Sequence, residues 1–161
     1  MTLDPHSYEP FDLALRMVYS QGSPSTILRL YRIGAKAGDA LAHYALASLY
    51  IHGNEPMGIK VNAPKALVHL RAAALTQCRA MFDLGVAYAL GNGVKANQRV
   101  AYTWFAKAAA NGSIYAKLEV GRRKFYGEGT KKDLKLARSL ERSALAQIAA
   151  FGRKRPKRAN G

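Results

Sequence analysis

Residues 80–112 read AMFDLGVAYALGNGVKANQRVAYTWFAKAAANG, and residues 116–148 read AKLEVGRRKFYGEGTKKDLKLARSLERSALAQI. The two stretches follow one pattern, offset by 36 positions. The offset brings alanine onto alanine and glycine onto glycine: Ala80 onto Ala116, Gly85 onto Gly121, Gly91 onto Gly127 and Gly93 onto Gly129. A fixed period of this size is typical of a solenoid, in which stacked repeats bury one another's apolar faces.

The pattern continues toward the N-terminus. Residues 43–54 match the first half of the unit and residues 65–74 match the second half. A longer loop, residues 54–60, replaces the compact glycine turn between them, and its role is left open by the sequence. Residues 27–42 match a second half alone, and residues 12–22 are the expected first helix of that pair.

The spacing of apolar residues within one unit is helical. Ala80 and Leu84 fall four positions apart on one face, and the glycines that follow are suited to a helix end and a tight turn. With 161 residues, of which 49% are apolar, the chain fits one domain. We predict an all-α solenoid of about four helix pairs over residues 11–151, an N-terminal extension at 1–10 and a disordered basic tail at 152–161.

Small and large residues have separate expected roles in this packing. We expect Gly85 and Gly121 to let neighbouring helix backbones approach closely. Trp104 and Phe105 are expected on the inner face of the second helix, with Trp104 and Tyr88 filling the remaining volume. On this interpretation Trp104→Ala would cost ~3–5 kcal/mol.

The unit at 80–112 resembles the Sel one-like repeat family, a relative of the tetratricopeptide repeats. The shared motif is A-x-x-x-L-G-x-x-Y-x-x-G-x-G-V followed by A-x-x-W-F-x-K-A-A-x-x-G. The next unit departs from it at Lys124, Leu140 and Glu141, and the preceding unit has Ala47 where the motif has glycine. The resemblance implies a right-handed α/α superhelix that acts as an adaptor or scaffold without catalysis. Family members often bind proteins or peptides, and some bacterial members are signalling adaptors or immunity proteins against secreted toxins.

Positions that vary between units predict the binding surface, because the positions that repeat are occupied by structural residues. On the three first helices, the residues beside the apolar stripe form rows: Ala45, Ser48 and His52; Asp83, Val86 and Leu90; Glu119, Arg122 and Tyr126. We expect these rows to form one extended surface for a protein partner. Arg122, Arg123 and Tyr126 are the preferred contacts. The alternative is a solvated helix face, with the partner bound elsewhere.

The net charge of +15 is concentrated toward the C-terminus. Residues 1–39 carry no net charge, residues 40–116 carry +5, and residues 117–161 carry +10. This field favours an acidic protein partner, whose approach it would accelerate. The tail cations could solubilise the chain, contact nucleic acid or ribosomes, guide an acidic partner, or act as a nuclear import signal: Arg153, Lys154, Arg155, Lys157 and Arg158.

A nucleic-acid- or ribosome-associated protein is the alternative function, because an isoelectric point near 10.2 is typical of that class. Against it, the sequence has no nucleic-acid reading motif and few aromatic residues outside the repeat core. A protein partner is therefore the preferred hypothesis.

No sequence motif points to an enzyme, a cofactor or a small-molecule substrate. The turns beginning at Gly91 and Gly127 follow helices and lack the third glycine of a dinucleotide-binding loop. The histidines lack the spacing of a common zinc motif, so no metal is expected. No run of about 18 apolar residues predicts a membrane span. The N-terminus does not resemble a secretory signal and Cys78 is the lone cysteine, so we expect a cytoplasmic protein.

Overall fold

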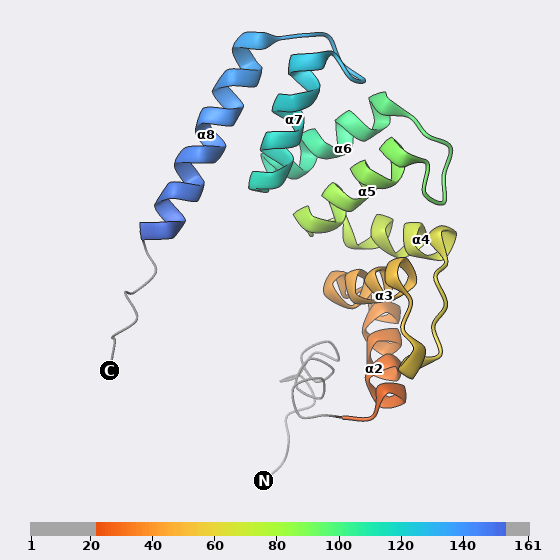
Figure 1. The fold of residues 1–161 in the computed structure, drawn as a ribbon. Helices are drawn as coiled ribbons and strands as arrows, with labels where there is room; N and C mark the ends of the chain where they lie inside the picture. Colours follow the sequence, from red (N-terminus) through yellow and green to blue (C-terminus); the bar gives the residue numbers. More distant parts are fainter. Residues whose placement is uncertain (1–21, 154–161) are drawn as a thin grey trace.

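The computed structural model describes residues 22–153, and this part of the chain folds into helices that succeed one another along an arc (Figure 1). Helices that are consecutive in sequence pack against each other. The prediction of an all-α solenoid is confirmed. The elements are α2 (Pro24–Lys36), α3 (Ala40–His52), the short 3-10 helix η1 (Glu55–Met57), α4 (Ala63–Ala73), α5 (Cys78–Leu90), α6 (Gln98–Ala110), α7 (Ile114–Tyr126) and α8 (Leu134–Arg153).

Three complete helix pairs correspond to the repeats: α3 with α4, α5 with α6, and α7 with α8. Helix α2 lies at the place of the second helix expected for an N-terminal pair. The first helix expected for that pair, at residues 12–22, falls outside the described residues except for Gly22. The predicted extension at 1–10 also lies outside them. Helix α8 continues to Arg153, past the boundary expected at residue 151. No described helix has both the length and the hydropathy that a membrane crossing requires.

Local side-chain hydrogen bonds mark where the helices begin. A short polar side chain precedes the first residue of several helices and accepts hydrogen bonds from free backbone N–H groups of the first turn. The caps are Asp39 for α3, Asn62 for α4, Asn97 for α6 and Ser113 for α7. The repeat therefore encodes helix starts as well as apolar faces.

The glycine turns have a second role that the sequence did not indicate. Gly91 ends α5 in the left-handed conformation, with φ of 80°, as the motif predicts. Gly93 then passes the start of α4, where an added Cβ would lie 2.6 Å from the backbone carbonyl carbon of Ala63. Gly129 approaches Gln98, the first residue of α6, in the same way. The second glycine of each turn is thus a contact between successive repeats.

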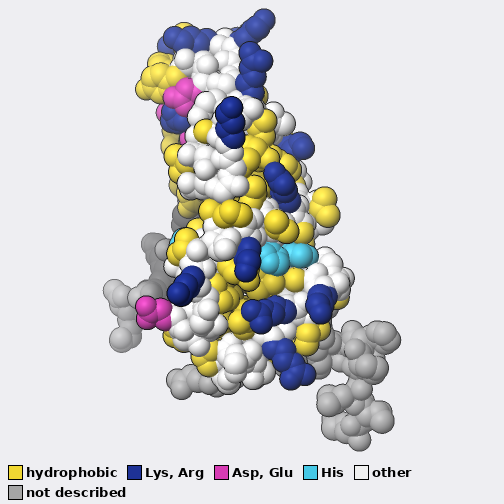
Figure 2. Space-filling view, turned by 90° about the vertical axis from the view of Figure 1, so that its right-hand side faces the viewer, with side chains coloured by type: hydrophobic (Ala, Val, Ile, Leu, Met, Phe, Trp, Pro, Cys, Tyr) yellow, Lys and Arg dark blue, Asp and Glu magenta, His cyan; other side chains and the backbone are white. Residues whose placement is uncertain are grey.

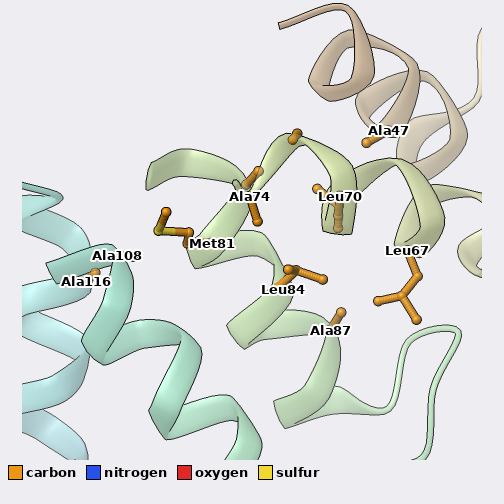
Figure 3. Close-up of a cluster of buried hydrophobic side chains, with 11 residues drawn as sticks. Ala47, Leu67, Leu70, Ala74, Met81, Leu84, Ala87, Ala108 and Ala116 are labelled. Atoms are coloured by element: carbon orange, nitrogen blue, oxygen red, sulfur yellow. The ribbon is translucent and has the colours of Figure 1, made fainter. Parts of the chain in front are cut away.

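The largest part of the core lies where α4 and α5 meet and extends to α3, α6 and α7 (Figure 3). Leu84 is fully buried at its centre. Alanines with no exposed surface occupy the close contacts between helices: Ala47, Ala73, Ala80, Ala108 and Ala116. Small side chains at these positions let the helices approach, which is how a chain rich in alanine builds a dense core.

One expectation about the core needs correction. Phe105, at 2% exposure, is the deeply buried aromatic residue of α6, whereas Trp104 is half-buried. The ammonium of Lys107 lies 4.4 Å from the centre of the Trp104 ring. The ring of Phe105 lies against Gly85, so this glycine makes room for a side chain and not for a neighbouring backbone. Gly121 does make the expected backbone approach, to the carbonyl oxygen of Ala137.

The longer loop between α3 and α4 packs against α2. Asn54 and Ile59 form an isolated antiparallel bridge that closes the loop around η1. Ile59 is buried in a cluster with side chains of α2 and α3, and Met57 packs on the same cluster. The insertion therefore contributes to the apolar cluster formed with α2 and α3.

Candidate partner-binding surface

Three residues of the predicted surface meet in one pocket of about 380 Å³ between α3, α4 and α5. His52 lies at the end of α3, and Asp83 and Val86 lie on α5. Leu67 and Leu70 of α4 are part of its apolar lining. The remaining lining residues are Ile51, Val61, Ala63, Ala66, Ala87 and Asn92. We call this the α3–α5 pocket.

Asp83 gives the α3–α5 pocket a carboxylate. The Tyr44 hydroxyl donates a hydrogen bond of 2.9 Å to Asp83 Oδ2, which links α3 to α5. Burial raises the pKa of Asp83, although the Tyr44 hydrogen bond and the charges of Arg79 and His52 act in the opposite direction. Burial and the neighbouring carboxylate raise the pKa of Tyr44 to about 12, so Tyr44 stays a donor at neutral pH. The pocket thus combines apolar walls with one oriented acceptor group.

Sequence reasoning missed part of this pocket. Val61 follows the inserted loop, where the repeat pattern is interrupted, so no periodic signal marked it. Its side chain is 64% exposed, which leaves it free to meet a partner. Ser48 is half-buried on α3, and Leu90 is 67% exposed at the end of α5. Neither residue lines the pocket.

Arg122 and Tyr126 line a separate pocket of about 360 Å³ between α7 and α8. The cause is a departure from the repeat. Glu141 occupies the position that Phe105 has one unit earlier and is exposed, so no ring covers Gly121. The ring of Phe125 meets the ring of Tyr126 edge to face at 5.0 Å. The predicted rows therefore contribute residues to two separate pockets.

The two arginines of α7 have different environments. Arg122 is exposed and forms ion pairs with Glu119 at 2.9 Å and with Glu128 at 2.7 Å. Arg123 is 3% exposed, donates to Glu119 at 2.8 Å and to Gln98 Oε1 at 2.9 Å, and lies over the Phe105 ring. The expectation that Arg123 faces a partner conflicts with this burial, because its donors are used inside the fold.

The charge of Glu119 is stabilised by these arginines. Burial alone would raise the pKa of Glu119, but the hydrogen bonds from Arg122 and Arg123 outweigh it and lower the pKa. Because Glu119 and Glu128 balance the two arginines, the positive charge of this end must come from other residues. Lys135, Arg138 and Arg142 contribute to it: they are exposed on α8 at helical spacing, and we call them the basic stripe. The tail cations, including the side chain of Arg153, lie outside the described residues.

Within residues 22–153, no three histidine, cysteine, aspartate or glutamate side chains gather closely enough to hold a metal ion. Cys78 is a free, half-buried thiol at the start of α5.

Comparison with known proteins identifies the repeat. The Sel1 repeat model matches residues 40–75, 78–113 and 114–147, which coincide with the three complete helix pairs. The chitin synthase regulator SKT5 of Saccharomyces cerevisiae is 32% identical over 108 residues, which make up 63% of this chain and 16% of SKT5. The chain thus spans only a small part of that relative.

Two solved structures are similar to most of this chain. A protective antigen of uropathogenic Escherichia coli with an SLR fold superposes with a TM-score of 0.79 and 27% identity, covering 86% of this chain and 30% of that one. A Sel1 repeat protein from Oxalobacter formigenes superposes with a TM-score of 0.66 and 32% identity, covering 76% and 92%. The chain belongs to the Sel1 repeat family, whose members are helical-repeat modules that generally mediate protein–protein interactions.

Proposed function

We propose that this chain is a non-enzymatic adaptor or scaffold that holds a segment of a protein partner in the α3–α5 pocket. The observation that carries the proposal is the meeting of His52, Asp83 and Val86 in one pocket, although they come from two repeats. The yeast relative is described as a regulator of an enzyme, which agrees with a module that acts through another protein. With Cys78 as the lone cysteine, we place this activity in the cytoplasm.

The lining of the pocket indicates what the partner presents. Leu67, Leu70 and Val61 suit an apolar side chain, whose burial would supply most of the affinity. The Asp83 carboxylate, held by Tyr44, suits a hydrogen-bond donor beside that anchor. A partner that also reaches the basic stripe on α8 would present acidic residues there, because Lys135, Arg138 and Arg142 are exposed.

A matched pair of valines tests this proposal. Val61 lines the pocket and Val68 does not, yet both are 64% exposed. The tagged protein and its Val61→Asp and Val68→Asp variants are used to co-purify partners from native cytosol after nuclease treatment. We expect the wild type and Val68→Asp to retain the same protein and Val61→Asp to lose it. Equal retention by both variants would show that the partner binds elsewhere.

Nucleic acid is the second candidate ligand, because the exposed cations of the basic stripe on α8 could contact phosphates. If about five phosphates are contacted, log K should fall with log salt at a slope of roughly −4 to −5. Binding of a fluorescent duplex is measured between 50 and 200 mM salt for the wild type and for Lys135→Ala/Arg142→Ala. A slope that is shallower by roughly 2 in the double variant would support this alternative, and a flat wild-type response would remove it.

A further inference from the structure

A third pocket, of about 290 Å³, lies between α2, α3 and α4 and shares no lining residue with the α3–α5 pocket. Arg32 and Lys36 line it from α2, His43 and Tyr50 from α3, and His69 from α4. Figure 2 shows histidine side chains (cyan) among Lys and Arg side chains (dark blue) on this face of the molecule. We call it the histidine pocket.

The two histidines form a hydrogen bond through the same ring nitrogen, Nδ1, of each. Nδ1 of His43 lies 3.0 Å from Nδ1 of His69, so one nitrogen must carry the proton and the other must accept it. The ring of Tyr50 stacks on His69, with centroids 5.7 Å apart and planes 10° from parallel. One added proton preserves the bond between the rings and leaves an N–H on each Nε2, whereas two added protons would oppose two N–H groups. The pair is therefore built to accept one proton.

Lysine and arginine side chains lie around the histidine pocket on α2 and α4. Arg32 and Lys36 come from α2, and Lys65 of α4 holds its ammonium 5.6 Å from the centre of the Tyr50 ring. No carboxylate lines the pocket. The carboxylate of Asp39, at the start of α3, accepts hydrogen bonds from the N–H groups of Leu41 and Ala42. Such a site attracts anions, because no carboxylate in its lining neutralises the nearby cations.

Without an anion, His69 favours its neutral state. Burial and the nearby His43 lower the pKa of His69, because a charged ring would lose hydration and face a second ring. An anion in the pocket would reverse this balance, since it favours the protonated form of a nearby base. Anion binding and proton uptake are then thermodynamically linked.

We propose that the histidine pocket binds an oxyanion, either a carboxylate or a phosphate group, between Arg32 and Lys36 of α2 and the His43–His69 pair. On binding, the pair takes up one proton from solvent and offers two N–H donors along with the two permanent cations. This site is separate from the α3–α5 pocket, so it does not depend on the function proposed there.

Nuclear magnetic resonance of the full chain tests this site directly. The ring-proton resonances of His43 and His69, assigned from His43→Gln and His69→Gln, are followed during titration with inorganic phosphate and, separately, with acetate at constant ionic strength. We expect saturable shifts and a higher titration midpoint for the pair in the presence of the bound anion. Saturation by phosphate alone, by acetate alone or by both assigns the site to phosphate groups, carboxylates or oxyanions in general.

The matched control is a lysine of equal charge outside the pocket. Lys36→Ala should weaken the anion's affinity about tenfold or more, as expected for loss of a charged hydrogen-bond partner. Lys95→Ala, in the exposed loop before α6, should leave it within about twofold. The absence of saturable shifts with both anions, or equal weakening by the two variants, would overturn the proposal. Unchanged melting temperatures confirm that both variants are folded.

Discussion

The ring of Phe105 occupies the space that a side chain at Gly85 would need. A Cβ added at Gly85 would lie 2.6 Å from Cε1 of the ring, well inside van der Waals contact. Phe82 meets the same ring edge to face at 5.1 Å, and the Arg123 guanidinium lies 4.9 Å from its centre. The glycine of one helix and the phenylalanine of the next thus form one structural unit, which α7 covers through Arg123.

We predict that Gly85→Ala destabilises the fold more than Gly121→Ala. The buried Phe105 ring cannot move away from a new methyl group, and overpacking of this kind costs about 1–3 kcal/mol. At Gly121 the nearest atoms, Ala137 O and Leu140 Cβ, would be 3.3 and 3.7 Å away. Alanine also gains up to about 1 kcal/mol over glycine in a helix, which offsets that small shift. Urea unfolding of both variants checks the order, and the reverse order would contradict the packing.

We predict that Phe105→Ala lowers the free energy of unfolding by about 3–5 kcal/mol and that Trp104→Ala lowers it by less. Phe105 is enclosed by α5, α6 and α7, so its removal leaves a cavity. Trp104 is half-buried, and water can fill the space beside Lys107. Chemical denaturation of the two variants provides the comparison. Equal losses of unfolding free energy in the two variants would mean that Trp104 contributes to the core as much as Phe105 does.

Much of the fold could be predicted from the sequence because the repeat enforces it three times. The offset of 36 residues located the helix pairs, and glycine turns such as the one at Gly91 located their ends. The choice between Trp104 and Phe105 could not be made, since adjacent positions lie only about 100° apart on a helix and both are apolar. Contacts between repeats, such as Gly93 with Ala63, were hidden because they join residues distant in sequence.

The candidate site was less predictable, because exposure and pairing depend on neighbouring helices. The row containing Asp83 and Val86 did reach a pocket, and His52 joined it from the preceding repeat. Arg122 and Arg123 are adjacent and chemically alike in the sequence, yet only Arg123 points toward α6 and is buried there. Val61 lines the pocket from a position just after an irregular loop. The repeat spacing in the sequence does not mark this position.

The contrast between these arginines is measurable. We predict that Arg123→Ala lowers the free energy of unfolding by up to about 3–5 kcal/mol, because it leaves Glu119 and Gln98 without their buried donor. Arg122→Ala removes only exposed ion pairs and should cost less than about 1 kcal/mol. Thermal and urea unfolding distinguish the two. A mild Arg123→Ala variant would mean that this guanidinium can reach solvent.

The same network predicts how stability depends on pH. The hydrogen bonds from Arg122 and Arg123 hold the pKa of folded Glu119 below its usual 4.5, so the unfolded chain binds a proton there more readily than the folded chain. Stability from Glu119 is therefore present above about pH 4.5 and is lost as the pH falls through the lower folded pKa. Urea unfolding of the wild type between pH 6 and pH 3 should show this loss.

Glu119→Gln should be less stable at pH 6 and show a flatter decline of stability with falling pH, because it has no charge to lose. Glu141→Gln, an exposed position on α8, should keep the wild-type slope. If Glu119→Gln also keeps that slope, the arginine pair does not stabilise the Glu119 carboxylate in the folded protein.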